Sequence, residues 1–175
     1  MARLVLLVLM GVIAFSVVTS CSRDTVPEEH KPQIEQAAQR CKAITPHLLA
    51  AQLAQESGWD PEAESPVGAL GIAQFMPQTW STWGSDANGD GRADPFSPAD
   101  AIRSQGRLMC HLHSLAKTSD IKGDPIDIAL AAYNAGWGSV KEYDGIPPFP
   151  ETTDYVVEVR ERAERIDDQF DSDAK

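Results

Sequence analysis

The sequence predicts a single, mainly α-helical domain, and three observations support this class. Apolar residues recur at helical spacing in several separate stretches, and most of these begin with a capping residue or a proline. No stretch shows the sustained alternation that is typical of a strand. The 175 residues suffice for one compact core with short tails, and no internal repeat divides them.

The N-terminal residues predict export. A basic start and an apolar run over 4–18 precede small residues, which is the layout of a secretory signal. Val18-Thr19-Ser20-Cys21 resembles the lipobox of bacterial lipoproteins, in which the cysteine becomes the lipidated first residue. The alternatives are a plain membrane anchor and cleavage without lipid. We expect a signal peptide over 1–20, then lipidated Cys21 and a polar tether over 21–31, which place the protein in the cell envelope.

The domain is expected over 32–170, and 171–175 should fray. Its first helix begins at Pro32, with Ile34 and Ala37 on the inner stripe. Thr45 and Ser97 are expected N-caps, each followed by a proline. The later helices are expected over 46–56, 77–83, 98–117, 125–135 and 137–143, with a last one from Thr152 or Thr153 to Phe170.

Charge and cysteine content limit the partners. The net charge is −11 and the isoelectric point about 4.7, which argues against nucleic acid because a nucleic-acid binder carries a basic face. If Cys21 is acylated, Cys41 and Cys110 remain, and in an oxidising compartment we expect them to pair. Metal ligation by Cys110 with His111 and His113 is the weaker alternative, because that spacing lacks a fourth ligand.

Glu56 is the first candidate catalytic residue. It continues the apolar stripe of Leu48, Leu49 and Leu53, so its carboxyl is aimed at the protein body, and it lies in the last turn of its helix. Desolvation and the negative end of the helix dipole both disfavour ionisation, so the pKa of Glu56 should be raised. A carboxyl protonated near neutral pH is a suitable general acid. The alternative is a glutamate that reaches solvent.

Three sequence blocks together resemble one family. Glu56-Ser57, the stretch from Gly68 to Pro77, and Ala132 to Gly136 (AAYNAG from 131) are similar in order and spacing to the catalytic domain of soluble-type (SLT) lytic transglycosylases. The middle block reads GIAQ where that family often has GLMQ. The resemblance covers about 42–160 and implies a lysozyme-like helical fold, similar to the goose-type enzymes, that acts on peptidoglycan glycan strands.

The resemblance also implies a reaction. These enzymes cleave the β-1,4 bond between N-acetylmuramic acid and N-acetylglucosamine without water and leave a 1,6-anhydro end, with a single carboxyl as acid and then base. Glu56 matches that carboxyl, so no catalytic cofactor is expected. Two-carboxylate hydrolysis would need a partner facing Glu56. Asp60, Glu62 and Glu64 are nearby in sequence, but nothing in the sequence places them across a cleft.

Four further residues match substrate-binding positions of the family, and each has a structural alternative. Gln74 offers a donor and an acceptor to the sugar amides or satisfies its own loop. Tyr133 ends an apolar stripe, so its hydroxyl is expected to hold the Glu56 carboxyl, or the ring only packs in the core. Ser65 is otherwise a turn residue and Asn134 a helix cap. Gly68 and Gly71 are expected to let the loop pass close to the ligand.

The stretch from 86 to 92 (DANGDGR) predicts a calcium loop. Asp86, Asn88 and Asp90 provide oxygens at positions one, three and five, and Arg92 provides a backbone carbonyl at position seven. Position twelve is a serine in place of the usual glutamate. The resemblance to transglycosylases with an extended loop offers Asp100 as the last ligand, with Asp94 as the alternative. A calcium ion here would be structural, and a metal-free Gly/Asp turn is the alternative.

The sequence therefore predicts a monomeric, lipid-anchored lytic transglycosylase. A hydrolytic lysozyme on the same scaffold and a non-catalytic peptidoglycan-binding lipoprotein remain the alternatives.

Overall fold

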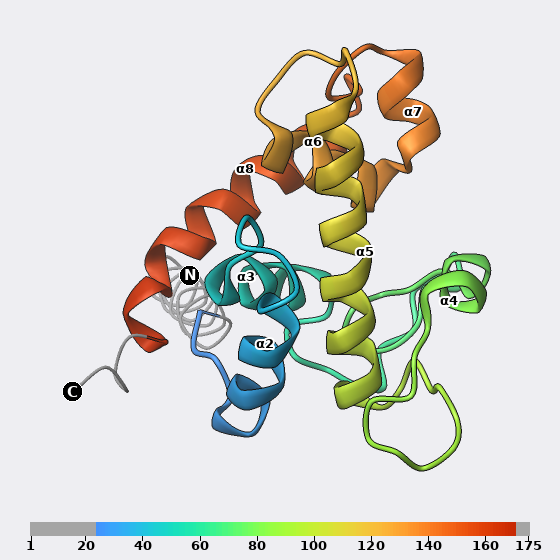
Figure 1. Cartoon of the computed structure of the whole chain (residues 1–175), viewed down its shortest axis with the longest axis vertical. Helices are drawn as coiled ribbons and strands as arrows, with labels where there is room; N and C mark the ends of the chain where they lie inside the picture. Colours follow the sequence, from blue (N-terminus) through green and yellow to red (C-terminus); the bar gives the residue numbers. More distant parts are fainter. Residues whose placement is uncertain (1–23, 171–175) are drawn as a thin grey trace, which may run out of the picture.

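The computed structural model describes residues 24–170 (Figure 1). The expected signal peptide, Cys21 and the tail at 171–175 lie outside the described residues. Within 24–170 there are seven α-helices, two 3-10 turns and isolated β-bridges but no strand, so the mainly α prediction is confirmed. The elements are η1 (Glu28–His30), α2 (Lys31–Ala38), α3 (Pro46–Glu56), α4 (Pro77–Trp83), α5 (Pro98–Thr118), α6 (Pro125–Ala135), α7 (Trp137–Glu142), α8 (Pro150–Arg165) and η2 (Asp167–Gln169).

Three helices begin where a capping side chain precedes a proline. The side chains of Thr45, Ser97 and Asp124 accept backbone N–H groups at the starts of α3, α5 and α6. The predicted start of the last helix was two or three residues late, because Pro150 occupies the first helical position of α8. Thr152, one of the two expected starts, lies inside α8 and donates its hydroxyl to Asn134 Oδ1.

Helix α5 is the central element. Its N-terminal half packs against α2, its C-terminal half packs against α6, and α3 packs against α8 (Figure 1). Gly106 permits the close approach of α2, since a Cβ there would lie 2.9 Å from the carbonyl oxygen of Ala37. Leu49, Ile102 and Leu130 are fully buried in the core that these helices share.

The predicted tether is shorter than expected, because the chain joins the domain from Asp24. Val26 is 1% exposed, and its N–H donates to the side chain of Gln169. The Asp24 carboxylate forms ion pairs with Arg162 and Arg165 of α8, at 3.4 and 2.8 Å. The mostly polar sequence of 21–31 did not indicate this packing, because only Val26 and Asp24 make the contacts.

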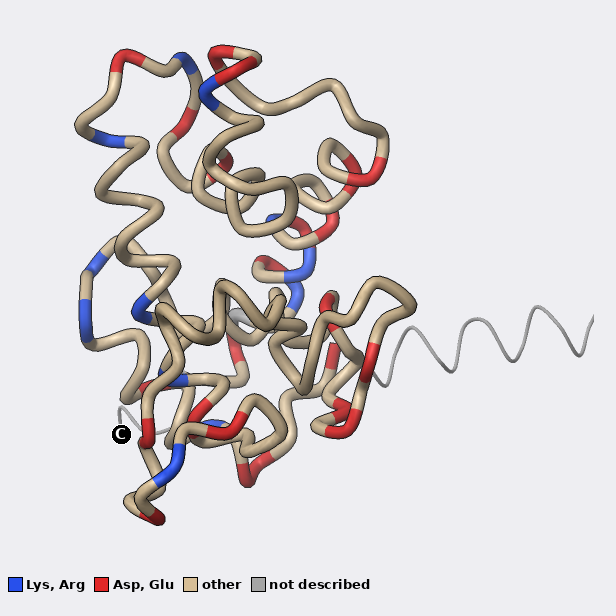
Figure 2. The backbone as a smooth tube through the Cα atoms, turned by 90° about the vertical axis from the view of Figure 1, so that its right-hand side faces the viewer, with Lys and Arg blue, Asp and Glu red and all other residues tan. Residues whose placement is uncertain are grey.

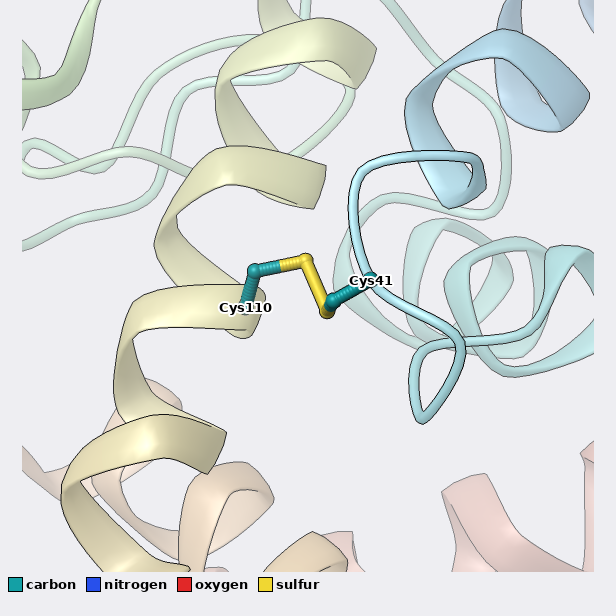
Figure 3. The surroundings of a disulfide bond; sticks show 2 residues. All are labelled: Cys41 and Cys110. Carbon is teal, nitrogen blue, oxygen red and sulfur yellow. A yellow bond between two sulfur atoms is a disulfide. The ribbon is translucent and has the colours of Figure 1, made fainter.

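The predicted disulfide is present between Cys41, just after α2, and Cys110 of α5 (Figure 3). It closes a separation of 69 residues, which corresponds to about 4 kcal/mol in the chain-entropy model. Because Cys110 is oxidised, it offers no thiolate to the alternative metal site.

The acidic residues are spread over both the upper and the lower part of the molecule (Figure 2). Among the residues described, no helix has the length and apolarity to cross a membrane.

Candidate active site

The five predicted site residues line one cavity of about 490 Å³. Its walls come from the C-terminal end of α3, the loop over 65–76, the end of α6 and the first half of α8. These five residues are Glu56, Ser65, Gln74, Tyr133 and Asn134. Segments separated by as many as 100 residues thus form one pocket, which is what the three separated sequence blocks require.

Glu56 is the last residue of α3, and the next residue, Ser57, fixes its position. The Ser57 hydroxyl donates to the carbonyl of Ile72 at 2.9 Å, which ties the end of α3 to the glycine-rich loop. Gly58 then turns the chain away with φ +64°. The Glu56 side chain is half-buried and reaches the cavity. Ser57 is therefore a structural member of the first block, a role that its sequence position alone did not indicate.

Tyr155 holds the Glu56 carboxyl, and this corrects the role expected for Tyr133. The Tyr155 hydroxyl donates to Glu56 Oε1 at 2.6 Å. Its oxygen accepts from Gln52 Nε2 at 3.1 Å, and Gln105 Nε2 in turn lies 3.5 Å from Gln52 Oε1. A buried chain of side chains thus leads from α5 to the carboxyl. The sequence indicated no role for Tyr155 in the site.

The environment favours the protonated form of the Glu56 carboxyl. Burial raises the pKa of Glu56 to about 7, the hydrogen bond from Tyr155 opposes this rise, and the charge of Glu151 adds to it. The direction agrees with the expectation from the sequence. A carboxyl with this pKa can donate a proton and accept one at the same pH.

Tyr133 supports the loop opposite Glu56. Its hydroxyl donates to the carbonyl oxygen of Ala73 at 2.8 Å, and its ring packs edge-on against Phe75. Burial and the charge of Glu56 hold the pKa of Tyr133 well above its ordinary value, so it stays a neutral donor. Tyr133 thus lines the cavity and fixes its floor, but its hydroxyl does not contact the carboxyl.

Gln74, Ser65 and Asn134 each make structural bonds while they line the cavity. Gln74 has φ +48°, and its Nε2 donates to the carbonyls of Ala63 and Gly71. Its amide oxygen remains as the group that can contact a ligand. Ser65 accepts the N–H of Ala69, and Asn134 Oδ1 accepts the Thr152 hydroxyl. Each of these three residues therefore has the structural role that the sequence left open as an alternative, and it lines the cavity as well.

Gly71 serves a close contact with the chain itself. It has φ +71°, and a Cβ at this position would lie 1.9 Å from the carbonyl oxygen of Pro95. We had expected the glycine to permit approach of a ligand. It instead lets the cavity loop pass against the 84–96 loop, so the two functional loops support each other.

Three exposed carboxylates of α8 line the same cavity: Glu151, Asp154 and Glu158. Their spacing of three and four residues places them on one helix face. This spacing is visible in the sequence and could have predicted the acidic face. None of Asp60, Glu62 and Glu64, the partners considered from the sequence, lines the cavity.

The predicted calcium loop is closed by hydrogen bonds. Asp86 accepts the N–H groups of Gly89 and Gly91, and Asn88 Oδ1 accepts the N–H of Asp90. Asp100 is fully buried, and its carboxylate accepts three backbone N–H groups, those of residues 87, 88 and 94. Asp94 pairs with Arg92. In residues 24–170 no three His, Cys, Asp or Glu side chains are grouped as a metal site.

The sequence profile of the family described as Transglycosylase SLT domain matches residues 33–155, so the chain belongs to this family. The predicted family is confirmed. Among named relatives, the membrane-bound lytic murein transglycosylase F of Pseudoalteromonas translucida is 32% identical over 120 residues, which are 69% of this chain and 23% of that protein. The enzyme of the same name from Histophilus somni is 39% identical over 92 residues, 53% of this chain and 18% of its own. The chain thus spans about a quarter or less of these relatives.

Solved structures agree on the fold. The 70-kDa soluble lytic transglycosylase in complex with bulgecin A superimposes with a TM-score of 0.67 at 24% identity, covering 84% of this chain and 25% of that one. The 70-kDa enzyme SLT70 from Escherichia coli gives 0.65 at 23% identity, over 83% and 25% of the two chains. The lysozyme-like helical fold predicted from the sequence is therefore confirmed.

Proposed function

We propose that this protein is a lytic transglycosylase that cleaves the β-1,4 bond between N-acetylmuramic acid and N-acetylglucosamine in peptidoglycan. The observation that carries the proposal is Glu56, whose carboxyl is held by Tyr155 at 2.6 Å in a cavity and has a pKa of about 7. The family membership and the names of the relatives support the substrate class.

In the proposed reaction Glu56 acts twice. The protonated carboxyl gives its proton to the glycosidic oxygen as the bond from that oxygen to the muramyl C1 breaks. The C6 hydroxyl oxygen of the same muramyl unit then forms a bond to C1, and its proton returns to the Glu56 carboxylate. No water is consumed, and the carboxyl ends in its starting state. The Tyr155 hydrogen bond stabilises the ionised carboxylate between the two transfers.

Hydrolysis on the same scaffold is the second candidate, because Glu151, Asp154 and Glu158 bring further carboxylates to the cavity. A carboxylate that faced the acid across a bound sugar would activate water. The absence of Asp60, Glu62 and Glu64 from the cavity favours the transglycosylase, since these were the partners that the loop could have supplied.

The products distinguish the candidates. We expect purified peptidoglycan digested by the full chain to release muropeptides with anhydro ends, lighter by one water than those with reducing ends. Glu56→Gln should abolish release, whereas Glu151→Gln should retain anhydro products. Reducing ends that disappear in Glu151→Gln would overturn the transglycosylase proposal in favour of hydrolysis, and no soluble product from the wild type would favour a binding protein.

We further propose that the protein is exported and held in the cell envelope as a monomer by a lipid on Cys21. The lipobox-like sequence and the membrane-bound relatives support this proposal. The intact mass of the protein from membranes should show the diacylglycerol and acyl additions on Cys21, and Cys21→Ala should lack them. An unmodified wild-type mass would contradict the anchor.

We also propose that the 84–96 loop binds a structural calcium ion through side-chain oxygens of Asp86, Asn88 and Asp90 and the carbonyl of Arg92. Support comes from the donor chemistry, since these oxygens stand at the first, third, fifth and seventh positions of the loop, with Asp100 as the expected last ligand. Calcium should raise the melting temperature and chelator should lower it, whereas Asp90→Ala should remove this response. An unchanged melting temperature of the wild type would refute the site.

A further inference from the structure

A second cavity of about 490 Å³ lies away from the Glu56 cavity. It is bounded by α2, by the first part of α5 and by the 84–96 loop, and it shares no lining residue with the first cavity. The two helices that bound it, α2 and α5, pack side by side (Figure 1). Nothing in the proposed cleavage reaction uses this region.

Five polar side chains line this second cavity: Gln33, Gln36, Arg40, Asn88 and Arg103. Asn88 forms hydrogen bonds with Asp90 within its own loop. The other four side chains have no hydrogen-bond or ion-pair partner in residues 24–170. Gln36 and Arg40 are exposed and Gln33 and Arg103 are half-buried, so their unpaired polar groups can reach a ligand in the cavity.

The charge of the cavity differs from that of the chain. The sequence carries a net charge of −11, yet no Asp or Glu lines this cavity, and two guanidinium groups do. Most other described arginines are engaged: Arg92, Arg160, Arg162 and Arg165 form ion pairs with aspartates. Two arginines without carboxylate partners in an acidic protein favour an anionic ligand.

The walls of the cavity are fixed before a ligand arrives. α2 and α5 approach closely at Ala37 and Gly106. The Cys41–Cys110 disulfide joins the same two segments directly after Arg40 (Figure 3). Asp100 holds the adjoining loop through the N–H groups of residues 87 and 88. A preformed site loses little conformational entropy on binding.

We propose that this cavity binds a short acidic peptide. Guanidinium groups bind carboxylates through paired hydrogen bonds, and the Gln33 and Gln36 amides match the donors and acceptors of peptide groups. The volume is within the range of small-ligand pockets.

The source of the peptide rests on the proposed function. Peptidoglycan strands carry short stem peptides with several free carboxylates, so a strand held in the Glu56 cavity would bring such peptides to the protein surface. The binding itself can be measured without any cleavage.

Titration calorimetry of the full-length protein with synthetic L-Ala–γ-D-Glu–meso-diaminopimelate tests the proposal. We expect saturable binding at one site, weakened about tenfold by Arg103→Gln and by Arg40→Gln, because each substitution removes charge-assisted hydrogen bonds to a carboxylate. Lys117→Gln is the matched control, because it removes one exposed positive charge from the same helix outside the cavity, and it should leave binding unchanged.

Two outcomes would overturn the proposal. Binding that is equal in wild type and Arg103→Gln, with both melting at the same temperature, would place the peptide elsewhere. Inorganic phosphate that binds more tightly than the tripeptide would identify an oxyanion site instead. The tripeptide with its carboxylates amidated should not bind. Because tripeptide binding is independent of cleavage, a protein that binds it but leaves glycan strands intact would refute the proposed function alone.

Discussion

The raised pKa of Glu56 predicts a pH-dependent cost in stability that Glu56→Gln removes. The folded protein favours the protonated carboxyl, with a pKa of about 7 against 4.5 for an unperturbed glutamate. The stability that the protonated Glu56 carboxyl contributes is fully present below the pKa of the unfolded state and is lost as the pH rises through the pKa of the folded state. At about 1.36 kcal/mol per unit, the loss is up to roughly 3 kcal/mol, and it is smaller to the extent that water enters the cavity.

Glutamine has the shape of the protonated acid and cannot ionise, and its amide oxygen can still accept from Tyr155. The unfolding free energies of wild type and Glu56→Gln should therefore be similar near pH 4 and differ by roughly 2–3 kcal/mol, with the variant more stable, above about pH 8. Urea unfolding at a series of pH values measures this difference. Glu62→Gln, an exposed glutamate of the neighbouring loop, is the control and should show no such trend.

The reasoning is refuted if Glu56→Gln is less stable than wild type at the higher pH. It is also refuted if the difference between the two proteins does not change with pH.

The remaining predictions concern the groups around the site. Tyr155→Phe removes the hydrogen bond that lowers the pKa of Glu56, so this pKa should increase further and the alkaline limb of the pH–rate profile should move to higher pH; an unchanged limb would contradict the contact. Reduction of Cys41–Cys110 should lower the unfolding free energy by up to about 4 kcal/mol, measured by urea unfolding with and without reductant; equal midpoints would contradict this. Gly71→Ala should lower the melting temperature markedly, since its methyl group would collide with Pro95, whereas Gly89→Ala, which meets nothing within 4 Å, should be milder; the reverse order would contradict the contact.

Local signals predicted most of the fold. The caps at Thr45 and Ser97 and the prolines after them specify helix starts through interactions within four residues, and the structure has those starts. The start of α8 was misplaced because three prolines between 147 and 150 were interpreted as helix breakers, although Pro150 suits a first helical position.

The site could be predicted only in part, because its decisive contact depends on packing. Tyr155 and Glu56 are 99 residues apart, and they meet because α3 packs against α8. The buried side chains of Gln52 and Gln105 support this contact, and no sequence pattern distinguished them from exposed glutamines. The family resemblance supplied the positions of Gln74 and Tyr133, but their hydrogen bonds to loop carbonyls follow from backbone geometry that no local pattern specifies.

Digestion of peptidoglycan in ¹⁸O-labelled water tests the central claim most directly. If the C6 hydroxyl is the nucleophile and Glu56 alone moves the proton, the muropeptides released by the wild-type protein should carry no ¹⁸O at C1. The Glu56→Gln variant should release no muropeptides. Incorporation of one ¹⁸O at the new end would contradict this mechanism and assign the attack to water.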